Sequence, residues 1–386
     1  MTAPNAGPTI VRDRRRGVVL AVVLILIFAL ITAVFTFQRR AVIDATIAQN
    51  RVDAAEAEAL ARGGLRVAEA IVYLLRLKEN AENASAGGEA APSLGGALAG
   101  GGDLWERLGE VPIELEGGRR LRLTLEDEGA RLNLNALVPQ AVPDANDEGE
   151  ADDDASLEDD DEALLYLEDV LRYVIDGMKE ADRGGPYDEK AIAANLIDWL
   201  DPDETAQDGR DENAYYRDQD PPYRAANGPF LSFDEVGLVE GIDPPLLEAM
   251  RAYMTVHPIG GLSGINLNRA EPWVLSIVYA GSAGDRELLR EPLVRDVWQL
   301  RQSDKILCDD GQADPLRCVS PNEVGNGDLG AGSFYPPVTL PAEVRVFRAV
   351  AEARVGLVTR RLEAVIDTRP DDGPQLLSWR RLRGGE

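Results

Sequence analysis

A run of apolar residues near the N-terminus constrains this chain more than any other feature. Val18 to Phe37 contains 20 residues without a charge. As a helix it would be roughly 30 Å long, the thickness of one bilayer hydrocarbon core. A cleavable secretory signal has a shorter apolar region of about 7–15 residues, followed by a small-x-small cleavage site. Here Gln38-Arg39-Arg40 follows the run instead. The sequence therefore predicts a segment that stays in the membrane.

The basic residues around the run predict its orientation. Four arginines precede it and two follow it: Arg12, Arg14, Arg15 and Arg16, then Arg39 and Arg40. Because positive residues stay on the cytoplasmic side, we expect a cytoplasmic N-terminus and a single pass, with the bulk of the chain on the other side.

The helical pattern continues beyond the membrane segment. Small and apolar residues recur at steps of three and four: Ala41, Ala45, Ala48, Val52, Ala55 and Ala59. This spacing predicts one helix of about 44 residues, roughly 66 Å long, with a stripe suited to close packing. We expect its first break at Gly63-Gly64, after which the pattern resumes.

Composition excludes several classes of function. The chain has 386 residues, enough for two or three domains, and a formal net charge of -28. Such a surface repels phosphate backbones, so we expect no nucleic-acid partner. The only histidine, His257, has no visible catalytic partner, which disfavours a Ser-His-Asp triad and a histidine-rich metal site. On the residues alone, an enzyme is therefore only the third and least favoured option.

Strand patterns occur on both sides of a helical block. Strands are predicted at 111–116, 119–127 and 130–138, and again at 344–355, 357–368 and 376–382. Gly117-Gly118 and Gly356 are natural hairpin positions between them. A helical pattern covers about 163–278. The arrangement predicts an α+β chain in which a helical domain is inserted into one sheet domain.

Two further stretches are predicted to be loops. Residues 85–102 are rich in glycine, alanine and serine, and 146–162 hold 11 acidic residues in 17. Self-repulsion predicts a disordered acidic loop, for which a metal-binding role is the less favoured alternative.

The helical block contains two stretches with helix-capping patterns. We expect Ser232 with Glu235 to form a capping box, Asp243 to cap a second helix, and Asn268 with Glu271 to cap a third. These stretches resemble helix-hairpin-helix or SAM-like units, some of which bind DNA through a glycine-hydrophobic-glycine turn. Here the turn is Gly241-Ile242-Asp243, which puts a carboxylate where phosphate would lie. We therefore expect these stretches to act as packing scaffolds and not as DNA-binding sites.

The N-terminal part of the chain resembles a type IV prepilin or pseudopilin. It has a short basic leader that ends in Gly17, an apolar run and a long amphipathic helix. The alternative is a single-pass membrane anchor that is not processed. Further motifs extend the resemblance to the K-type minor pseudopilins of the type II (general) secretion pathway. They are "RGVVLAVVLIL", "DEGARLNLNALV", "LIDWLDPDE", "DENAYYR", "YRAANGPFLSFDEV", "INLNRAEPWVL" and "VFRAVAEARVGLVTRRLEAVI".

The resemblance implies a cleavage and a position in the filament. Prepilin peptidase would cut between Gly17 and Val18, and family members are then N-methylated. Most pseudopilins carry a Glu five residues after the cut, which is taken to pair with the N-terminal ammonium of the preceding subunit. This chain has Val22 there. A subunit without that carboxylate need not dock beneath another one, which suits a filament tip.

The resemblance also implies a domain arrangement. The pseudopilin fold is a long N-terminal helix packed on an antiparallel sheet, here with a large inserted helical domain. The expected segments are a leader (1–17), a transmembrane segment (18–37), its amphipathic continuation (38–80), the first part of the core (105–138), the insertion (139–310) and the second part of the core (311–386).

The resemblance implies a structural function. The protein would be anchored in the bacterial inner membrane with its bulk in the periplasm. It would join the minor pseudopilins I and J and the major pseudopilin at the pseudopilus tip, starting assembly and limiting filament length during protein export. The alternative from a different class is a membrane-anchored DNA-uptake receptor that uses the helix-hairpin-helix units.

One acidic segment offers ligands for a cation. The stretch from Asp198 to Arg217 is rich in carboxylates, which calcium prefers, although it lacks the EF-hand spacing. The alternative is an exposed acidic turn. The family's known calcium binding favours a site. The candidate ligands are Asp198, Asp201, Asp203, Asp208, Asp211, Glu212 and Asn213.

The two cysteines, Cys308 and Cys318, enclose nine residues in a turn-rich segment. In an oxidising periplasm a disulfide is the default. Two free thiols or a metal pair are the alternatives.

Overall fold

The fold is described from a computed structural model of the chain. It describes residues 15–85, 105, 109, 111–138, 153–207, 209–260, 263–282, 284–303, 305–309, 317–330, 332–342, 344–370 and 373–382. The loop predicted over 85–102 lies outside these residues except for Ser85, as does the first part of the acidic run, 146–152.

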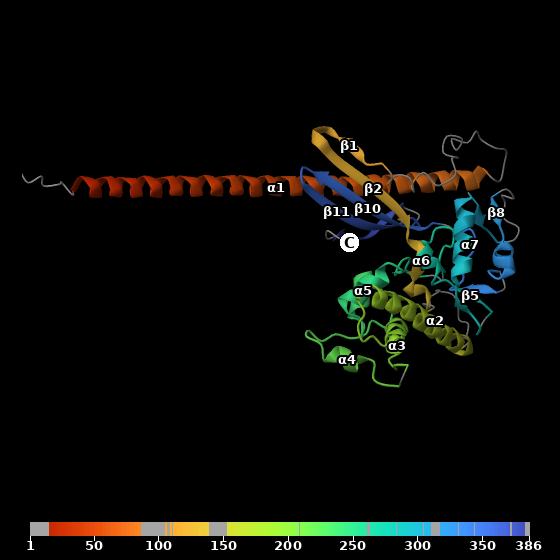
Figure 1. Ribbon diagram of the computed structural model, residues 1–386. Helices are drawn as coiled ribbons and strands as arrows, with labels where there is room; N and C mark the ends of the chain where they lie inside the picture. Colours follow the sequence, from red (N-terminus) through yellow and green to blue (C-terminus); the bar gives the residue numbers. More distant parts are fainter. Residues whose placement is uncertain are drawn as a thin grey trace, which may run out of the picture.

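The first element is a single helix, α1, from Arg15 to Ser85, 71 residues long. Figure 1 shows it as a rod whose N-terminal half extends free of the rest of the molecule. All side chains of residues 18–50 are exposed. This stretch makes α1 long and apolar enough to cross a membrane. The prediction of a break at Gly63-Gly64 is wrong, because α1 passes through both glycines.

Gly64 lies where α1 packs on the sheet, which explains why a glycine occupies the middle of a helix. A Cβ atom added to Gly64 would lie 2.9 Å from Leu121 Cδ1 and 3.1 Å from Ala351 Cβ. An atom added to Gly63 would meet nothing within 4 Å. The missing side chain at Gly64 therefore permits close approach of helix and sheet, and neighbouring turns hold the helix together.

A five-stranded antiparallel sheet lies across the C-terminal half of α1 (Figure 1). Its order is β1-β2-β10-β11-β12. The strands are Ile113–Leu115, Arg119–Asp127, Val346–Val355, Val358–Asp367 and Gln375–Leu382. The hairpin at Gly356, with a φ of 56°, is confirmed. Gly117 and Gly118 also have positive φ and lie in the predicted turn between β1 and β2, a 3-10 turn over Glu116–Gly118. The last three predicted strands are all present.

The core between helix and sheet is made of alternate residues from each strand. Leu121, Leu123 and Leu125 of β2 point towards α1, and they pack with residues from the neighbouring strands. The helix contributes Ala57, Ala61, Ala68 and Val72, all fully buried. These residues recur on one face of the helix, but they are not the predicted small-residue stripe. The members of that stripe, Ala41, Ala45, Ala48, Val52, Ala55 and Ala59, are all exposed.

A large domain is inserted between β2 and β10, the two neighbouring strands at the centre of the sheet. Its helices are α2 Asp153–Glu180, α3 Glu189–Leu200, α4 Asn213–Arg217, α5 Pro244–Arg251, α6 Pro272–Leu275 and α7 Glu291–Gln302. Short strands pair within it: β3 Leu132–Asn133 with β4 Met254–Thr255, β5 Tyr279–Gly281 with β6 Glu287–Leu288 and β9 Ser333–Tyr335, and β7 Ile306–Leu307 with β8 Cys318–Val319. The α+β class with a long helix on an antiparallel sheet is confirmed. The SAM-like assignment and the domain boundaries stay predictions.

Two predictions about local structure in the insertion are wrong. The strand expected over 130–138 is reduced to β3, between 3-10 turns at Glu128–Ala130 and Leu134–Ala136, because its asparagines turn inward to cap the backbone. The acidic run was expected to be a loop through residue 162, but α2 begins at Asp153. Acidic residues are favoured in the first turns of a helix, so this run suits a helix N-terminus.

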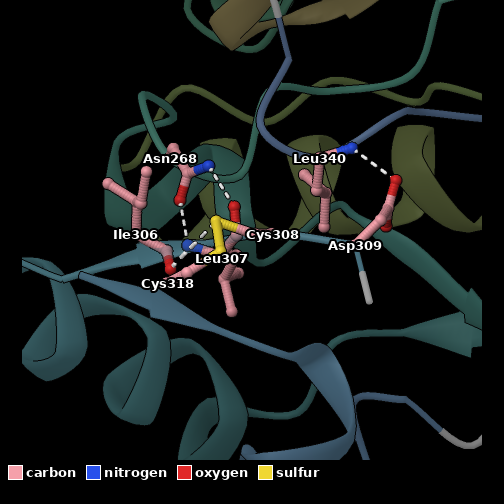
Figure 2. The surroundings of a disulfide bond; sticks show 7 residues. All are labelled: Asn268, Ile306, Leu307, Cys308, Asp309, Cys318 and Leu340. Carbon is pink, nitrogen blue, oxygen red and sulfur yellow. Dashed lines mark hydrogen bonds between the residues drawn. A yellow bond between two sulfur atoms is a disulfide. The ribbon is translucent and has the colours of Figure 1, made fainter. Parts of the chain in front are cut away.

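The capping predictions have mixed outcomes. Asp243 caps α5 by accepting a hydrogen bond from Leu246 N at 3.0 Å, as predicted. Ser232 makes no side-chain cap, and the turn that follows, Phe233–Leu238, is a 3-10 helix. Asn268 does not cap α6 either. Its side-chain amide instead pairs with the backbone of Leu307, as Figure 2 shows.

Polar contacts fix the insertion to the end of the sheet where it leaves and returns. Asp127, the last residue of β2, accepts a hydrogen bond from Asn266 Nδ2 at 2.8 Å. Glu128 Oε1 accepts one from Thr255 Oγ1 at 2.7 Å. Burial acts to raise the pKa of Glu128, but the nearby guanidinium groups of Arg348 and Arg131 outweigh it and lower the pKa. The insertion is therefore joined to the sheet through buried charges.

Candidate functional site

Three carboxylates converge where α3 ends and α4 begins. Asp198 is in the last turn of α3, Asp201 caps its C-terminus, and Glu212 directly precedes α4. One carboxylate oxygen from each lies within 4.8 Å of the other two. The three residues are only 6%, 5% and 7% exposed. We call them the acidic triad.

Glu212 shows the electrostatic cost of this arrangement. Burial, together with the charges of Asp198 and Asp203, raises the pKa of Glu212 to about 7. Its Oε2 atom accepts a hydrogen bond from Asn227 Nδ2 at 3.4 Å, while its buried Oε1 has no hydrogen-bond partner among the described residues. A bound cation would supply the missing interaction and offset the repulsion between the carboxylates.

The donor set suits a hard cation. Carboxylate oxygens are the preferred ligands of calcium and magnesium, whereas the softer transition metals favour histidine and cysteine. Three buried carboxylates leave further coordination positions for backbone carbonyls and water, and calcium takes six to eight oxygens. The residues present therefore fit a calcium ion.

Not all of the predicted ligands join the triad. Asp203 is exposed and accepts a hydrogen bond from Thr205 N at 2.6 Å. Asp211 is exposed and paired with Arg217 at 2.5 Å, and the hydrogen bond from Arg217 lowers the pKa of Asp211. The side-chain oxygen of Asn213 accepts a hydrogen bond from Ala225 N at 3.0 Å. Asp208 lies outside the described residues.

Asn227 is the residue at this site that the ligand prediction missed. Besides its contact with Glu212, its Nδ2 atom donates to the backbone carbonyl of Asp203, so it joins both ends of the acidic segment. Its φ of 45° is unusual for a residue with a side chain. Asn227 belongs to the stretch "YRAANGPF", which the family resemblance had already singled out.

The asparagines of "NLNALV" hold the insertion together from inside. Asn135 is 2% exposed. Its Nδ2 atom donates to the carbonyls of Phe230 and Val256 at 2.9 and 2.7 Å, and its Oδ1 atom accepts from Phe230 N at 2.8 Å. A side chain that satisfies three backbone groups replaces a missing strand partner. This motif therefore acts in folding.

The predicted cleavage position lies at the start of α1. Gly17 and Val18 are both within the helix, in its first turns. Val22, where most pseudopilins carry Glu, is 50% exposed, like the apolar residues around it. No acidic residue occurs between Val18 and Phe37. The whole run thus presents an uncharged surface to lipid or to another helix.

The two cysteines are joined by a disulfide in the structure, with a Cα–Cα distance of 5.5 Å (Figure 2). Cys308 follows β7, and Cys318 begins β8. Beside it, Asn268 binds the backbone N–H and carbonyl of Leu307 at 2.7 and 2.8 Å, and Asp309 Oδ2 accepts from Leu340 N at 2.8 Å. The disulfide therefore closes the segment from 308 to 318, and the side chains of Asn268 and Asp309 hold its start in place by hydrogen bonds.

The turn that would have to bind DNA has another role. Gly241 has a φ of 90°, and the carboxylate of Asp243 is used to cap α5. Tyr187 also donates to Asp243, at 2.8 Å. An anion held at the start of this helix would be repelled by that carboxylate. The DNA-uptake alternative thus gains no support.

Part of the insertion matches a known protein family. Residues 130–259 match the family model described as "Type II secretion system (T2SS), protein K". The match covers about a third of the chain, and we call the inserted domain that contains it the protein K domain. The match begins three residues after the end of β2 and covers the acidic triad, Asn135 and Asn227, so it contains the whole candidate cation site.

Two known proteins are similar to this chain. The "Type II secretion system protein K" of Pseudomonas aeruginosa is 28% identical over 256 residues, which are 65% of this chain and 64% of that protein. The chain thus spans just under two thirds of that relative's length. A structure of the GspK-GspI-GspJ complex from enterotoxigenic Escherichia coli matches with 17% identity and a TM-score of 0.44, covering 89% of this chain and 100% of the matched chain.

Proposed function

We propose that the protein is a minor pseudopilin of the type II secretion system. The observation that carries this proposal is α1 together with the protein K domain. The run from Val18 to Phe37 of α1 is apolar and exposed, and the C-terminal part of α1 packs on the sheet. An exposed apolar helix fits a single-pass anchor, and its continuation beyond the lipid is suited to pack against the helices of other subunits.

The orientation follows from charge. The arginines before the run favour a cytoplasmic N-terminus, with the sheet and the protein K domain in the periplasm and the anchor in the inner membrane. Prepilin peptidase would remove residues 1–17, and Val18 would become the methylated first residue. The role is structural, without catalytic turnover.

The tip of the pseudopilus is the position that the chain fits best. The solved relative is named for a complex of GspK with GspI and GspJ, and we propose the I and J minor pseudopilins as partners here too. Val22 offers no carboxylate for the N-terminus of a subunit above it. Such a subunit starts assembly and limits filament length, above the major pseudopilin.

The experiment that tests this function locates the protein on the filament. Pseudopili assembled in cells that carry this secretion system are labelled with gold-conjugated antibodies against the protein K domain. We expect gold at one end of each filament only. Gold spaced evenly along the shaft, or none on filaments that form equally well without the protein, would refute the tip role.

We further propose that the acidic triad binds one calcium ion. Asp198, Asp201 and Glu212 would hold the ion, which would supply the positive charge that three buried carboxylates need. Calcium would then stabilise the segment between α3 and α4, and through it the protein K domain.

This second proposal is tested by calorimetry and thermal unfolding of the full chain in detergent, with calcium or with a chelator. We expect calcium to raise the melting temperature. Glu212→Gln should abolish that rise, because it removes a buried ligand charge. Asp218→Asn is the matched control, since this exposed carboxylate directly follows α4 and is not part of the triad. No heat of binding and no shift in the unmodified protein would refute the site.

A further inference from the structure

The two edges of the five-stranded sheet differ in length. β1 has only three residues, whereas β12 has eight, Gln375–Leu382. β12 pairs with β11 on one side, and no described strand pairs with its other side. A long edge strand presents unpaired backbone N–H and C=O groups, to which another extended chain can add.

The face of β12 that points towards α1 is only partly covered. α1 lies mainly over β10, β11 and β2 and reaches the edge strand only with a few long side chains. Leu376 and Trp379 of β12 are therefore 49% and 51% exposed. Beside them lies a cavity of about 210 Å³, whose apolar floor is formed by Leu65, Ile366, Leu376 and Trp379. We call it the edge groove.

Two arginines and one glutamate of α1 complete the lining of the edge groove: Arg62, Arg66 and Glu69. Arg62 and Arg66 project from α1, and Arg62 lies over the Trp379 ring at 5.3 Å from its centre. Arg62 and Arg381 share one carboxylate, that of Glu58, at 2.8 and 2.6 Å. Two guanidinium groups on a single carboxylate leave an excess positive charge.

Arg66 adds an accessible charge at the rim. Its side chain is 82% exposed and makes only a 3.3 Å contact with Glu69. The chain as a whole has a net charge of -28, so a basic rim around an apolar floor differs in charge from the rest of the molecule. Its potential favours a partner with acidic side chains.

We propose that the edge groove and the free edge of β12 bind an extended segment of a partner protein in which apolar and acidic residues alternate. Backbone hydrogen bonds to β12 would hold the segment. Because side chains alternate along a strand, the apolar side chains of the bound segment would all lie on one face and pack on Leu376 and Trp379. Its acidic groups would reach the nearby arginines. This inference goes beyond the proposed function and does not depend on it.

The test uses two labelled eight-residue peptides and the full chain in detergent micelles. One alternates valine or isoleucine with glutamate, and the other carries lysine in place of glutamate. Fluorescence anisotropy measures binding. We expect the acidic peptide to bind at least about tenfold more tightly. Methylation of alternate backbone nitrogens of the acidic peptide should reduce binding to that of the lysine peptide, since it removes the strand hydrogen bonds.

Three variants locate the binding. Trp379→Ala removes the apolar floor and should abolish binding of the acidic peptide. Arg66→Glu, at an exposed position that the fold does not need, should weaken binding about three- to tenfold. Arg183→Glu, an exposed arginine after α2, is the matched control and should leave binding unchanged. Circular dichroism checks that each variant is folded.

Three results would overturn the proposal. They are equal affinity for the acidic and lysine peptides, full binding by the backbone-methylated peptide, and binding unaffected by Arg66→Glu in a folded variant. Self-association of the chain that is abolished by Trp379→Ala, without peptide binding, would assign the groove to a second copy and would also overturn it.

Discussion

Among the described residues, the molecule has two hydrophobic cores, and alanine supplies five of the 13 buried residues in one but only three of the 43 in the other. Between α1 and the sheet, the fully buried residues include Ala61, Ala68 and Ala351. The protein K domain is packed around large side chains instead, among them Tyr166, Leu196 and Phe230, each fully buried. Small residues bring a helix close to a sheet but bury little apolar surface per residue, whereas large ones bury much.

The two cores differ in composition because the two regions have different structural roles. α1 must lie flat on the sheet along one face and keep its other faces available for neighbours, and close approach achieves this. The protein K domain must hold six described helices and a buried acidic triad in place, which needs a dense core, a disulfide and buried asparagines. We therefore expect mutations to act differently in the two regions.

The largest effect is expected in the dense core. Leu196→Ala, at a fully buried position of α3, should lower the free energy of unfolding by about 2–5 kcal/mol, because a cavity remains. Denaturant unfolding of the full chain in detergent measures the loss. Hydrogen exchange should show faster exchange in α2 and α3 and little change in the sheet. Equal acceleration in both regions would mean that the two cores unfold as one.

Removing the disulfide should have a similar but smaller effect. Cys308→Ser combined with Cys318→Ser should cost about 2–3 kcal/mol, since a short loop is no longer closed in the unfolded chain. The thermal midpoint of the oxidised protein is compared before and after reduction, with the double variant as reference. If reduction shifts the midpoint of the variant as much as that of the unmodified protein, the bond is not the cause.

Asp127 connects the two regions and should make stability depend on pH. Burial raises the pKa of Asp127 to about 6, above the usual 3.8. The folded state therefore binds the proton more tightly, and the stabilisation present below about pH 4 is lost as the pH rises through 6. The difference is on the order of 3 kcal/mol. Asp127→Asn should flatten this slope in melting curves, whereas Glu116→Gln, an exposed control, should leave it unchanged.

The smallest expected effect is a difference in stability between substitutions at two adjacent glycines of α1. Gly64→Leu should lower stability by about 1–3 kcal/mol, because the new side chain meets Leu121 and Ala351 of the sheet. Gly63→Leu has open space and should gain up to about 0.8 kcal/mol from helix propensity. Thermal unfolding of both variants checks the sign. The same sign for both would contradict the close helix–sheet contact.

Much of the sheet could be predicted from the sequence, because its alternation is strong. Leu121, Leu123 and Leu125 alternate with polar residues, and Gly356 separates two apolar runs. The Gly63-Gly64 break was predicted wrongly, since local propensity favours an interruption and only the packed sheet explains the helix. The stretch around Asn133 and Asn135 was mistaken for a strand, because nothing in the sequence distinguishes a buried amide from an exposed one.

The candidate cation site shows a similar limit. The sequence indicated seven ligands from local acidity, and the structure brings together Asp198, Asp201 and Glu212. Which carboxylates converge depends on the path of the chain between α3 and α4, and a count of acidic residues does not contain that path. Asn227 was missed because an asparagine in a loop carries no charge signal.

The central claim concerns the N-terminus of α1, because the proposed function as a pseudopilin depends on the exposed apolar helix. Intact-mass measurement and N-terminal sequencing of the protein extracted from membranes test it most directly. We predict a chain that begins at Val18 and carries one N-methyl group. A protein that retains Met1 to Gly17 would contradict the claim and leave α1 as an ordinary membrane anchor.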